Sequence, residues 1–415
     1  MFTPAQRRTL TVWLLWSVAL ALGVRMALYQ ARVVDQRANG FVAYYTSARL
    51  LTEGEDPASF YDRPWFQSHV ARFEPDVLEI FSANPPTMSV LLLPLSALGY
   101  HQARAIWVGF SFLIVIATIA WMLAALHISG LWAPALVAFM FAYHPLVATL
   151  DHGQFYAVGL ALLAVVFHGY RKGRDLAIGF PLGFLLVTKT AGLLVWPLLV
   201  IEKRWRAIAL AVGVAAVTVL LSWPWIGAAA WDAYLREASE LTQNPLLAVT
   251  AYQTVFGFFH HLLGAGGAPI GAPLIQLPAA ATALTVIIST GLLIVTALVA
   301  RRAPASDAIF SACVLLGLVL TPVTGASHFT LALLPIAVLV AEAQRQQNTR
   351  YAWLLIAGAL VIGADVPYRS PRLADGLLAV FAYPKLYGAL LLWGLAVCTP
   401  LVRGGPNILA SNDVR

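Results

Sequence analysis

Residues 105–150 read AIWVGFSFLIVIATIAWMLAALHISGLWAPALVAFMFAYHPLVATL and contain no Asp, Glu, Lys or Arg. Residues 241–300 form a second stretch that lacks all four charged residue types. A surface in contact with water cannot be built from such stretches, so lipid must be the solvent for much of the chain. The two stretches predict a polytopic membrane protein whose spans are helices.

The composition of the whole chain agrees with this prediction. Of its 415 residues, 60% are hydrophobic and 11% are charged, whereas soluble domains carry about 25% charged residues. These values exclude an ordinary cytosolic enzyme, a disordered protein and a coiled coil. The net charge of +7 would favour nucleic-acid binding in a soluble protein. In a membrane protein, Lys and Arg instead mark cytoplasmic loops, so we expect membrane lipids and no nucleic acid as partners.

Apolar runs of spanning length recur along the chain. They cover residues 10–30, 105–126, 131–148, 155–170, 206–227, 278–300, 307–322, 329–345, 351–365 and 377–401. Residues 175–201 are interrupted by Thr188, Lys189 and Thr190, which predicts two short helices with a polar apex. We therefore expect an all-α fold of about twelve spans in a single integral membrane domain, residues 1–415. The large first loop, 31–104, is expected to carry amphipathic helices, and a second loop covers 228–277.

The basic residues predict which loops lie inside the cell. If Pro85–Tyr100 is re-entrant or interfacial, the clusters Arg171–Arg174 and Lys203–Arg206 lie in the cytoplasm, as the positive-inside rule requires. The inner segments then hold 14 of the 26 Lys and Arg residues, and 14 of the 19 Asp and Glu residues fall outside. We therefore expect a multi-pass protein of the inner (plasma) membrane with both termini in the cytoplasm. Residues 10–30 are interpreted as an uncleaved signal anchor.

The first loop contains a pattern typical of a helix. Aromatic and aliphatic residues recur at spacings of three and four residues, at Phe41, Tyr44, Tyr45, Ala48 and Leu51. Gly54 is expected to end this helix. One interpretation is an amphipathic helix that lies on the membrane. The alternative is an aromatic wall for a sugar, with Tyr44 and Tyr45 as substrate-binding residues.

Several other polar residues lie in or beside apolar segments, where a membrane protein keeps them only for a structural or functional role. Asn84 precedes Pro85-Pro86, which favours an extended backbone before an apolar segment. Asp151 and Gln154 belong either to a tight polar turn or to the same outer cavity as the first loop. Lys189 interrupts an apolar run and needs a partner, which is either an acid or a lipid-linked phosphate. His328 lies at the outer start of a span, where it is either a core histidine or a site residue.

No sequence motif indicates a nucleotide, a metal or another cofactor. The chain has no Walker A motif, no Rossmann glycine fingerprint, no HExxH and no CxxC pair. Cys313 and Cys398 lie in apolar runs and are interpreted as small core residues. We therefore expect no cofactor and no metal site, although the sequence leaves open whether a divalent metal takes part.

An ordered set of these motifs resembles glycosyltransferase family 87, the polyprenyl-phosphate-mannose-dependent α-mannosyltransferases of the GT-C superfamily. The resemblance runs from about residue 35 to 340. The set comprises Phe41, Tyr44-Tyr45, Ala48, Gly54, Tyr61-Asp62, Asn84–Thr87, Leu92–Pro94, Gly153-Gln154, Lys189, Arg204–Ala207, Thr321-Pro322 and His328. The resemblance implies a GT-C-type fold with its active site in an outward cavity under the first loop.

The resemblance also implies a reaction. A hexosyl residue, specifically mannosyl, would pass from a polyprenyl-phosphate donor to an envelope glycolipid or glycan acceptor with inversion. Lys189 would stabilise the departing phosphate, and His328 matches the family's histidine near the donor phosphate. Family members have an acid directly before the phenylalanine of the first-loop helix, but this chain has Gly40 there. The candidates for the catalytic base are therefore Asp35 and Glu79, followed by Asp76 and Asp151.

The sequence is also compatible with two other functions. The same outer cavity would suit a transporter or flippase for a lipid-linked saccharide, and the missing acid at position 40 favours such a protein. A non-catalytic assembly subunit of an envelope-polysaccharide system is the third interpretation. Only the transferase should release polyprenyl phosphate from its donor when acceptor is supplied.

Overall fold

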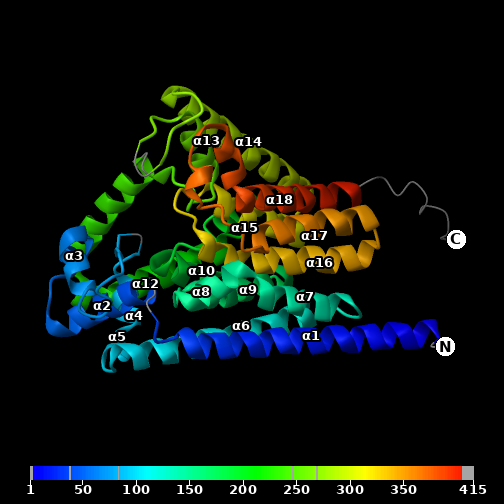
Figure 1. Cartoon of the computed structure of the whole chain (residues 1–415), viewed down its shortest axis with the longest axis horizontal. Coiled ribbons are helices and arrows are strands. Elements are labelled where there is room, and N and C mark those ends of the chain that lie inside the picture. The colour runs from blue at the N-terminus through cyan, green and yellow to red at the C-terminus, as the bar shows by residue number, and fades with distance from the viewer. Residues whose placement is uncertain (1–2, 37–38, 83, 245–246, 268–269, 404–415) are drawn as a thin grey trace.

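The computed structural model describes residues 3–36, 39–82, 84–244, 247–267 and 270–403. Within these ranges the chain forms helices and, apart from one isolated bridge between Gly267 and Gly271, no β-pairing. The cytoplasmic C-terminal tail that we expect from the charge pattern lies outside the described residues. Figure 1 shows that α1 (Pro4–Val33) begins and α18 (Pro384–Arg403) ends at the same end of the molecule.

The helices show that the chain is a multi-pass membrane protein. Six helical segments in the described ranges are long and apolar enough to cross a membrane. They are α1, α6 (Tyr100–Ala125), most of α12 (Trp205–Gln243), α14 (Pro278–Arg302), Ala326–Gln346 and most of α18. A seventh arises if α7 (Trp132–Ala142) and α8 (His144–Asp151), which are bent by 46° at Tyr143, form one span.

The prediction of about twelve spans is therefore wrong. Several of the predicted spans are helices too short to cross: α10 (Asp175–Thr188) and α15 (Asp307–Leu320) have 14 residues and α17 (Thr349–Gly363) has 15. A helix of 14 residues is about 21 Å long, and the hydrocarbon core is about 30 Å thick. α9 (Tyr156–Lys172), another of the predicted spans, has 17 residues. Helices such as α15 are apolar because protein surrounds them, and hydropathy does not separate burial in protein from exposure to lipid.

The first loop folds into short helices. After α2 (Phe41–Glu53) come η1 (Pro57–Tyr61), α3 (Arg63–Val70), α4 (Thr87–Leu91) and α5 (Leu93–Ser96). The prediction that Pro85–Tyr100 does not span is consistent with α4 and α5, which are two very short helices. α2 ends at Gly54, whose φ of 83° is the left-handed conformation expected of a C-terminal glycine. α2 is buried on nearly all sides, so it is not an amphipathic helix on the membrane surface.

Residues 175–201 form the predicted pair of short helices, α10 and α11 (Val195–Ile201), with Lys189 directly after α10. α10 packs closely along α12 because Gly179 and Gly183 have no side chains. A Cβ on Gly183 would lie 2.2 Å from the carbonyl oxygen of Ala211. Small residues four apart on facing helices are typical of close packing in membranes. This packing fixes the end of α10, and therefore Lys189, relative to α12.

The C-terminal part of the chain covers the other side of the core. It comprises α13 (Val255–Leu263), α14, α15, η3 (Ala326–Ala332), α16 (Leu333–Gln346), α17, η4 (Pro371–Leu373), η5 (Gly376–Ala382) and α18. α16 is buried over most of its length. Lys385 is fully buried and donates to the carbonyl oxygens of Ile362 (2.6 Å) and Ala364 (3.4 Å). It satisfies the end of α17, which explains one charge inside a predicted span.

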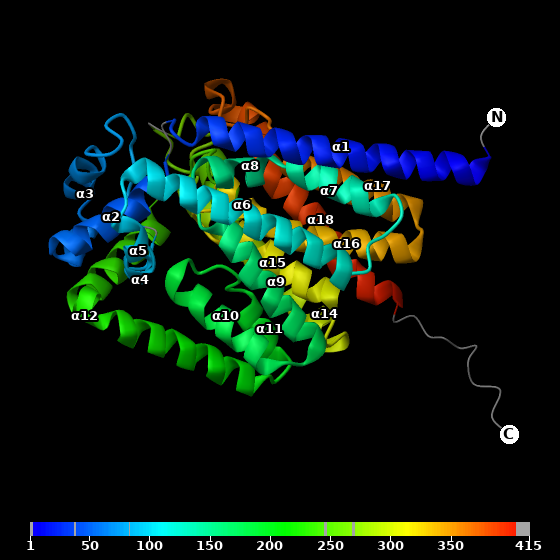
Figure 2. The same ribbon diagram turned by 90° about the horizontal axis from the view of Figure 1, so that it is seen from below.

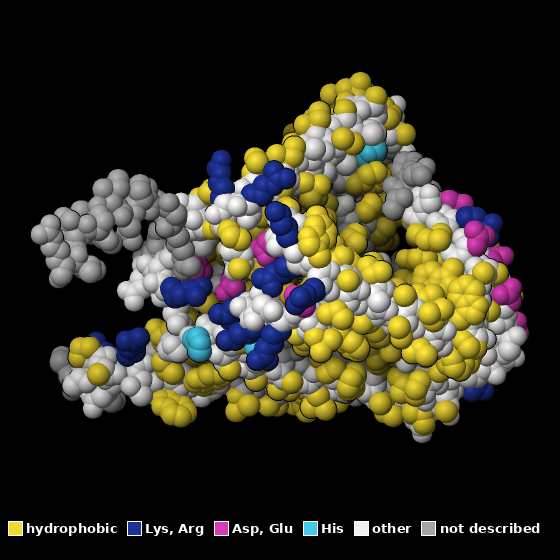
Figure 3. Space-filling model, turned by 180° about the vertical axis from the view of Figure 1, so that it is seen from behind, with side chains coloured by type: hydrophobic (Ala, Val, Ile, Leu, Met, Phe, Trp, Pro, Cys, Tyr) yellow, Lys and Arg dark blue, Asp and Glu magenta, His cyan; other side chains and the backbone are white. Residues whose placement is uncertain are grey.

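Charged side chains are distributed unevenly over the surface. Figure 3 shows one face on which Lys and Arg gather toward the end where α1 begins and α18 ends. A group of acidic side chains lies at the opposite end, and apolar side chains cover much of the surface between them. This distribution agrees with a molecule whose two ends meet water on opposite sides of a membrane.

Candidate functional site

A cavity of about 350 Å³ lies beneath the first loop. Its wall is formed by the first loop, the start of α9 and the turn before it, the segment after α10, the outer part of α12 and the loop after it, and the chain from α15 to η3. Its polar or aromatic lining residues are Tyr44, Glu79, Ser82, Asn84, Gln154, Tyr156, Lys189, Thr190, Tyr234, Tyr252, Thr321, Thr324 and His328. Six residues predicted from the sequence as site residues therefore meet here: Glu79, His328, Tyr44, Asn84, Gln154 and Lys189.

Lys189 is the centre of a hydrogen-bond chain on one side of the cavity. Its Nζ donates to the hydroxyl of Tyr44 (2.9 Å) and to Oδ1 of Asn84 (2.6 Å). Tyr44 in turn donates to Oε1 of Gln154 (2.6 Å). Nζ also lies 5.2 Å and 5.4 Å from the ring centroids of Tyr44 and Tyr156, a distance at which a cation is attracted to an aromatic face.

Neutral groups thus hold the Lys189 ammonium, and no described carboxylate forms an ion pair with it. An ammonium has three protons to donate, and Tyr44 and Asn84 accept two of them. A positive charge in such surroundings is costly unless an anion joins it. The arrangement is therefore suited to a phosphate, to which Lys contributes a compact charge.

Glu79 lies at the cavity wall and is oriented by the backbone. Its Oε2 accepts the N–H of Gly40, its Oε1 accepts the N–H of Ile80 (3.1 Å), and its own N–H donates to Gln67 (2.9 Å). Burial raises the pKa of the Glu79 carboxyl above its usual value of 4.5, although these hydrogen bonds and the charge of Lys189 oppose the rise. A carboxylate with a raised pKa at a cavity wall has the properties of a general base.

Gly40 explains how Glu79 reaches this place. The glycine has a φ of 90°, and a Cβ there would lie 2.5 Å from both Nε2 of Gln154 and the carbonyl oxygen of His152. Any other residue at position 40 would therefore push the 152–154 turn away from α2. Gly40 and the half-buried Glu79 are therefore hydrogen-bonded to each other at the cavity wall.

His328 lies on η3 and faces Tyr156. The two ring centroids are 4.3 Å apart. Nδ1 of His328 is buried and has no hydrogen-bond partner among the described residues. A buried polar atom without a partner costs free energy, so Nδ1 is free to bond to a group in the cavity. Lys189, Tyr156 and His328 lie together at one end of the cavity.

The other predicted site residues lie elsewhere. Asp35 is exposed at the end of α1 and faces His101, with 3.6 Å between Oδ1 and Nδ1. The carboxylate of Asp151 accepts from Gln30 (2.5 Å) and Tyr29 (3.2 Å). The hydroxyl of Tyr45 donates to the carbonyl oxygen of Leu98 (2.6 Å). Asp35, Asp151 and Tyr45 do not line the cavity.

Three aromatic residues of the cavity were missed by the sequence analysis. Tyr156 follows the Asp151–Gln154 turn by two residues, and that spacing is the one available indication of its role. Tyr234 and Tyr252 come from α12 and from the loop after it. Nothing in their neighbouring residues suggests a site. Only the tertiary structure brings them to the cavity.

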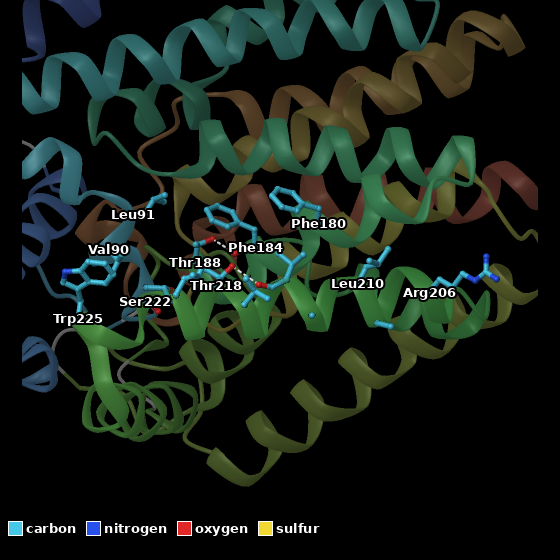
Figure 4. A pocket seen from close by; sticks show the side chains of 16 residues that line it. Val90, Leu91, Phe180, Phe184, Thr188, Arg206, Leu210, Thr218, Ser222 and Trp225 are labelled. Atoms are coloured by element: carbon cyan, nitrogen blue, oxygen red, sulfur yellow. Dashed lines mark hydrogen bonds between the residues drawn. The ribbon is translucent and has the colours of Figure 1, made fainter.

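A second, apolar groove lies beside the cavity (Figure 4). Its volume is about 1170 Å³, and it is lined by α4, by Phe180, Phe184 and Thr188 of α10, and by one face of α12 from Arg206 to Trp225. That face extends over about 28 Å, at about 1.5 Å per residue. Thr188, the residue before Lys189, lines the groove, so the groove and the charged cavity are adjacent at the end of α10.

The described residues contain no group of three or more His, Cys, Asp or Glu side chains that could hold a metal ion. The cavity presents carboxylate, ammonium, imidazole and hydroxyl groups. Glu79 is the carboxylate and Lys189 the ammonium among these groups.

Comparison with known proteins gives the family. Neither curated proteins nor solved structures gave a match. The model of glycosyltransferase family 87 matches residues 83–322, a range that contains Asn84 and Lys189 and ends just before His328. Because this match covers more than half of the chain and agrees with the motifs and the membrane helices, the protein belongs to glycosyltransferase family 87.

Proposed function

We propose that the protein is an inverting membrane glycosyltransferase that moves a hexosyl residue, specifically mannosyl, from a polyprenyl-phosphate donor to a glycolipid or glycan acceptor of the envelope. The observation that carries the proposal is the single cavity in which Glu79 faces a ligand space shared with Lys189 and His328. A transferase needs a base for the acceptor and a cation for the leaving phosphate, and both are present.

In the proposed reaction, Glu79 takes the proton of the acceptor hydroxyl as that oxygen attacks the anomeric carbon. The bond between the anomeric carbon and the phosphate oxygen breaks, and its electron pair stays on the phosphate. Lys189 stabilises this charge in surroundings with little water, where the interaction is strong. His328 completes the phosphate end of the cavity by donating a hydrogen bond to an oxygen of the leaving group or the acceptor.

The apolar groove supports a lipid-linked donor. Its lining is mostly apolar and includes Thr188 (Figure 4), the residue before Lys189. An isoprenoid chain in the groove would bring its terminal phosphate to the Lys189 ammonium. A soluble nucleotide sugar has no use for such a groove.

We place the active site on the extracytoplasmic side. The basic clusters 171–174 and 203–206 precede and follow α10 and α11 at the end opposite to Lys189. The positive-inside rule assigns these short clusters to the cytoplasm. The acids of the first loop then lie outside, where envelope acceptors are found.

Turnover of a labelled donor tests the proposal. The purified protein in liposomes should transfer labelled mannose from polyprenyl-phosphate mannose to an envelope lipid extract and release polyprenyl phosphate. Glu79→Gln should lower this turnover by about 10²- to 10⁴-fold, the usual contribution of a general base. Asp35→Asn, which changes an exposed carboxylate outside the cavity, should leave turnover unchanged.

Two results would contradict the proposal. Movement of the intact donor between leaflets without any release of polyprenyl phosphate would favour the flippase. Full activity of Glu79→Gln together with loss of activity in Asp35→Asn would move the base to the end of α1.

A further inference from the structure

The helix α12 contains one residue that leaves helical geometry. Gly227 has φ 65° and ψ 180°, a region of the backbone map that only glycine occupies readily. A Cβ on Gly227 would have nothing within 4 Å, so the need for glycine comes from the backbone and not from crowding. Figure 2 shows α12 turning sharply toward α2 and α3.

The bend creates a separate outer segment, residues 228–243, which we call the roof. α12 from Trp205 to Gly227 is already about 34 Å long, enough to cross the hydrocarbon core. The roof therefore extends beyond the lipid, and it carries Asp232, Arg236 and Glu237 as a segment in water would.

One face of the roof lines the cavity. Tyr234, Ala238 and Leu241, which follow one another at four and three residues, line the cavity. The opposite face is in solvent, because Leu235 is 61% exposed and Asp232 and Arg236 form an exposed ion pair of 3.1 Å. A single layer of helix thus separates the cavity from the outside.

The roof is attached to the first loop at its edge. Arg63 of α3 donates through Nε to Oε1 of Glu237 (3.0 Å), and the rings of Tyr61 and Tyr234 lie 5.9 Å apart. The side chain of Arg63 is 43% exposed, and such ion pairs contribute little free energy. α12 also packs against η1, and the Arg63–Glu237 pair is the part of this attachment that a change of charge removes.

We propose that the roof, bent at Gly227 and fastened by Arg63 and Glu237, keeps water out of the cavity so that the sugar passes to the acceptor and not to water. This inference rests on the proposed function. In both reactions an oxygen bonds to the anomeric carbon, its proton passes to Glu79, and the bond to the phosphate oxygen breaks with its electron pair on the phosphate. Only the source of the oxygen differs, so exclusion of water decides the product.

A charge exchange tests the fastening. Free mannose and mannosylated lipid are measured together from labelled polyprenyl-phosphate mannose, with an envelope lipid extract as acceptor. Arg63→Glu and Glu237→Arg should each raise the ratio of hydrolysis to transfer about two- to fivefold. The double variant, in which the charges are exchanged, should restore the wild-type ratio. Arg236→Glu, which changes the outward ion pair of the same segment, should leave the ratio unchanged.

Gly227→Ala tests the bend. The added methyl group meets no atom, but the backbone strain should displace the roof and raise the ratio about tenfold or more. Gly291→Ala is the matched control, because Gly291 lies within α14 and a Cβ there also has nothing within 4 Å. Its ratio should equal that of the wild type.

Access to the cavity gives a readout that does not depend on activity. In a chain whose Cys313 and Cys398 are replaced by Ala, Ala238→Cys should react slowly with a membrane-impermeant maleimide. Adding Gly227→Ala or Arg63→Glu should speed this reaction severalfold.

The outcomes separate the two proposals. A wild-type protein that neither transfers nor hydrolyses the donor refutes the proposed function, while labelling of Ala238→Cys still decides whether the roof closes the cavity. Normal transfer with an unchanged ratio and unchanged labelling in all variants refutes the roof. A charge-exchanged double variant that is no better than either single variant refutes the fastening by Arg63 and Glu237.

Discussion

Glu79 and Lys189 bear the formal charges among the described residues that line the cavity, and their surroundings differ in kind. Backbone N–H groups orient Glu79, whereas a tyrosine hydroxyl, an amide oxygen and two aromatic faces hold Lys189. The first arrangement leaves a carboxylate that can accept a proton. The second leaves an ammonium that can accept an anion.

The pH dependence of turnover should report the Glu79 carboxyl. Only its ionised form can act as a base, so kcat/KM should fall as the pH falls through the pKa of Glu79. Because burial raises this pKa, the fall should occur above pH 4.5, the usual value for Glu. A pH profile of donor turnover measures it. An acid limb that persists unchanged in Glu79→Gln would assign it to another group.

We expect the Tyr44 hydroxyl to affect turnover because it accepts a hydrogen bond from Lys189. Tyr44→Phe removes the group that joins Lys189 to Gln154, and hydrogen bonds to charged groups contribute about 1.5–3 kcal/mol. We expect turnover to fall about 10- to 100-fold. Tyr45→Phe is the matched control, because the hydroxyl of Tyr45 contacts Leu98 outside the cavity. Equal losses in both variants would show that the effect comes from folding of α2.

At the scale of elements, the parts of α12 before and after Gly227 line two different sites. Its inner half lines the apolar groove with one face, and its outer half covers the cavity. α10 contributes to the groove and ends at Lys189. In the proposed function, these two helices connect the site of the donor's apolar chain with the site of its charged head.

Filling the groove should impair long donors selectively. Val217 lines the groove and Val212 does not, although both are about equally exposed, at 53% and 54%. Val217→Trp should raise KM for a long-chain polyprenyl-phosphate mannose about tenfold, because each excluded CH₂ group costs about 0.8 kcal/mol. A donor with a very short chain should be affected little. Val212→Trp should behave as the wild type, and an equal effect of both variants would exclude the groove as the chain site.

The close contact of α10 and α12 should be sensitive to a single methyl group. A Cβ on Gly183 would lie 2.2 Å from the carbonyl oxygen of Ala211, so Gly183→Ala must separate the helices. We expect a loss of about 1–3 kcal/mol in stability, as for other overpacked sites. Thermal inactivation in detergent measures it, with Gly291→Ala as a control. An unchanged midpoint would mean that the two helices separate at no cost.

At the scale of the whole molecule, the charges define two ends. Basic side chains gather at the end where α1 begins and α18 ends, and acidic side chains form a group at the other (Figure 3). The cavity lies beneath the first loop, which includes α2 and α3. We therefore propose that the membrane separates the cavity from the basic loops.

Labelling of single cysteines should show this sidedness. In a chain without Cys313 and Cys398, Lys172→Cys and Asp56→Cys are both at exposed positions. We expect an impermeant maleimide to label Asp56→Cys in intact cells and Lys172→Cys only after the membrane is opened. Labelling of both positions in intact cells would contradict the assignment of the cavity to the extracytoplasmic side.

Much of the fold followed from local patterns. The uncharged stretches 105–150 and 241–300 predicted membrane helices, the Thr188–Thr190 interruption predicted two short helices, and Gly54 predicted the end of α2. The number of spans did not follow, because hydropathy measures the transfer of a side chain out of water. It does not distinguish whether the new neighbour is lipid, as for α14, or protein, as for α15.

The sequence by itself determined the solvent of this protein, its family and a short set of polar residues, among them Glu79, Asn84, Lys189 and His328. The tertiary structure alone decided which of them meet. Glu79 and Asp35 are both acids of the first loop, but only Glu79 lines the cavity. The reason is physical: hydrogen bonds and packing between residues far apart in the chain, such as Gly40 with Glu79 and Arg63 with Glu237, set the distances on which catalysis depends.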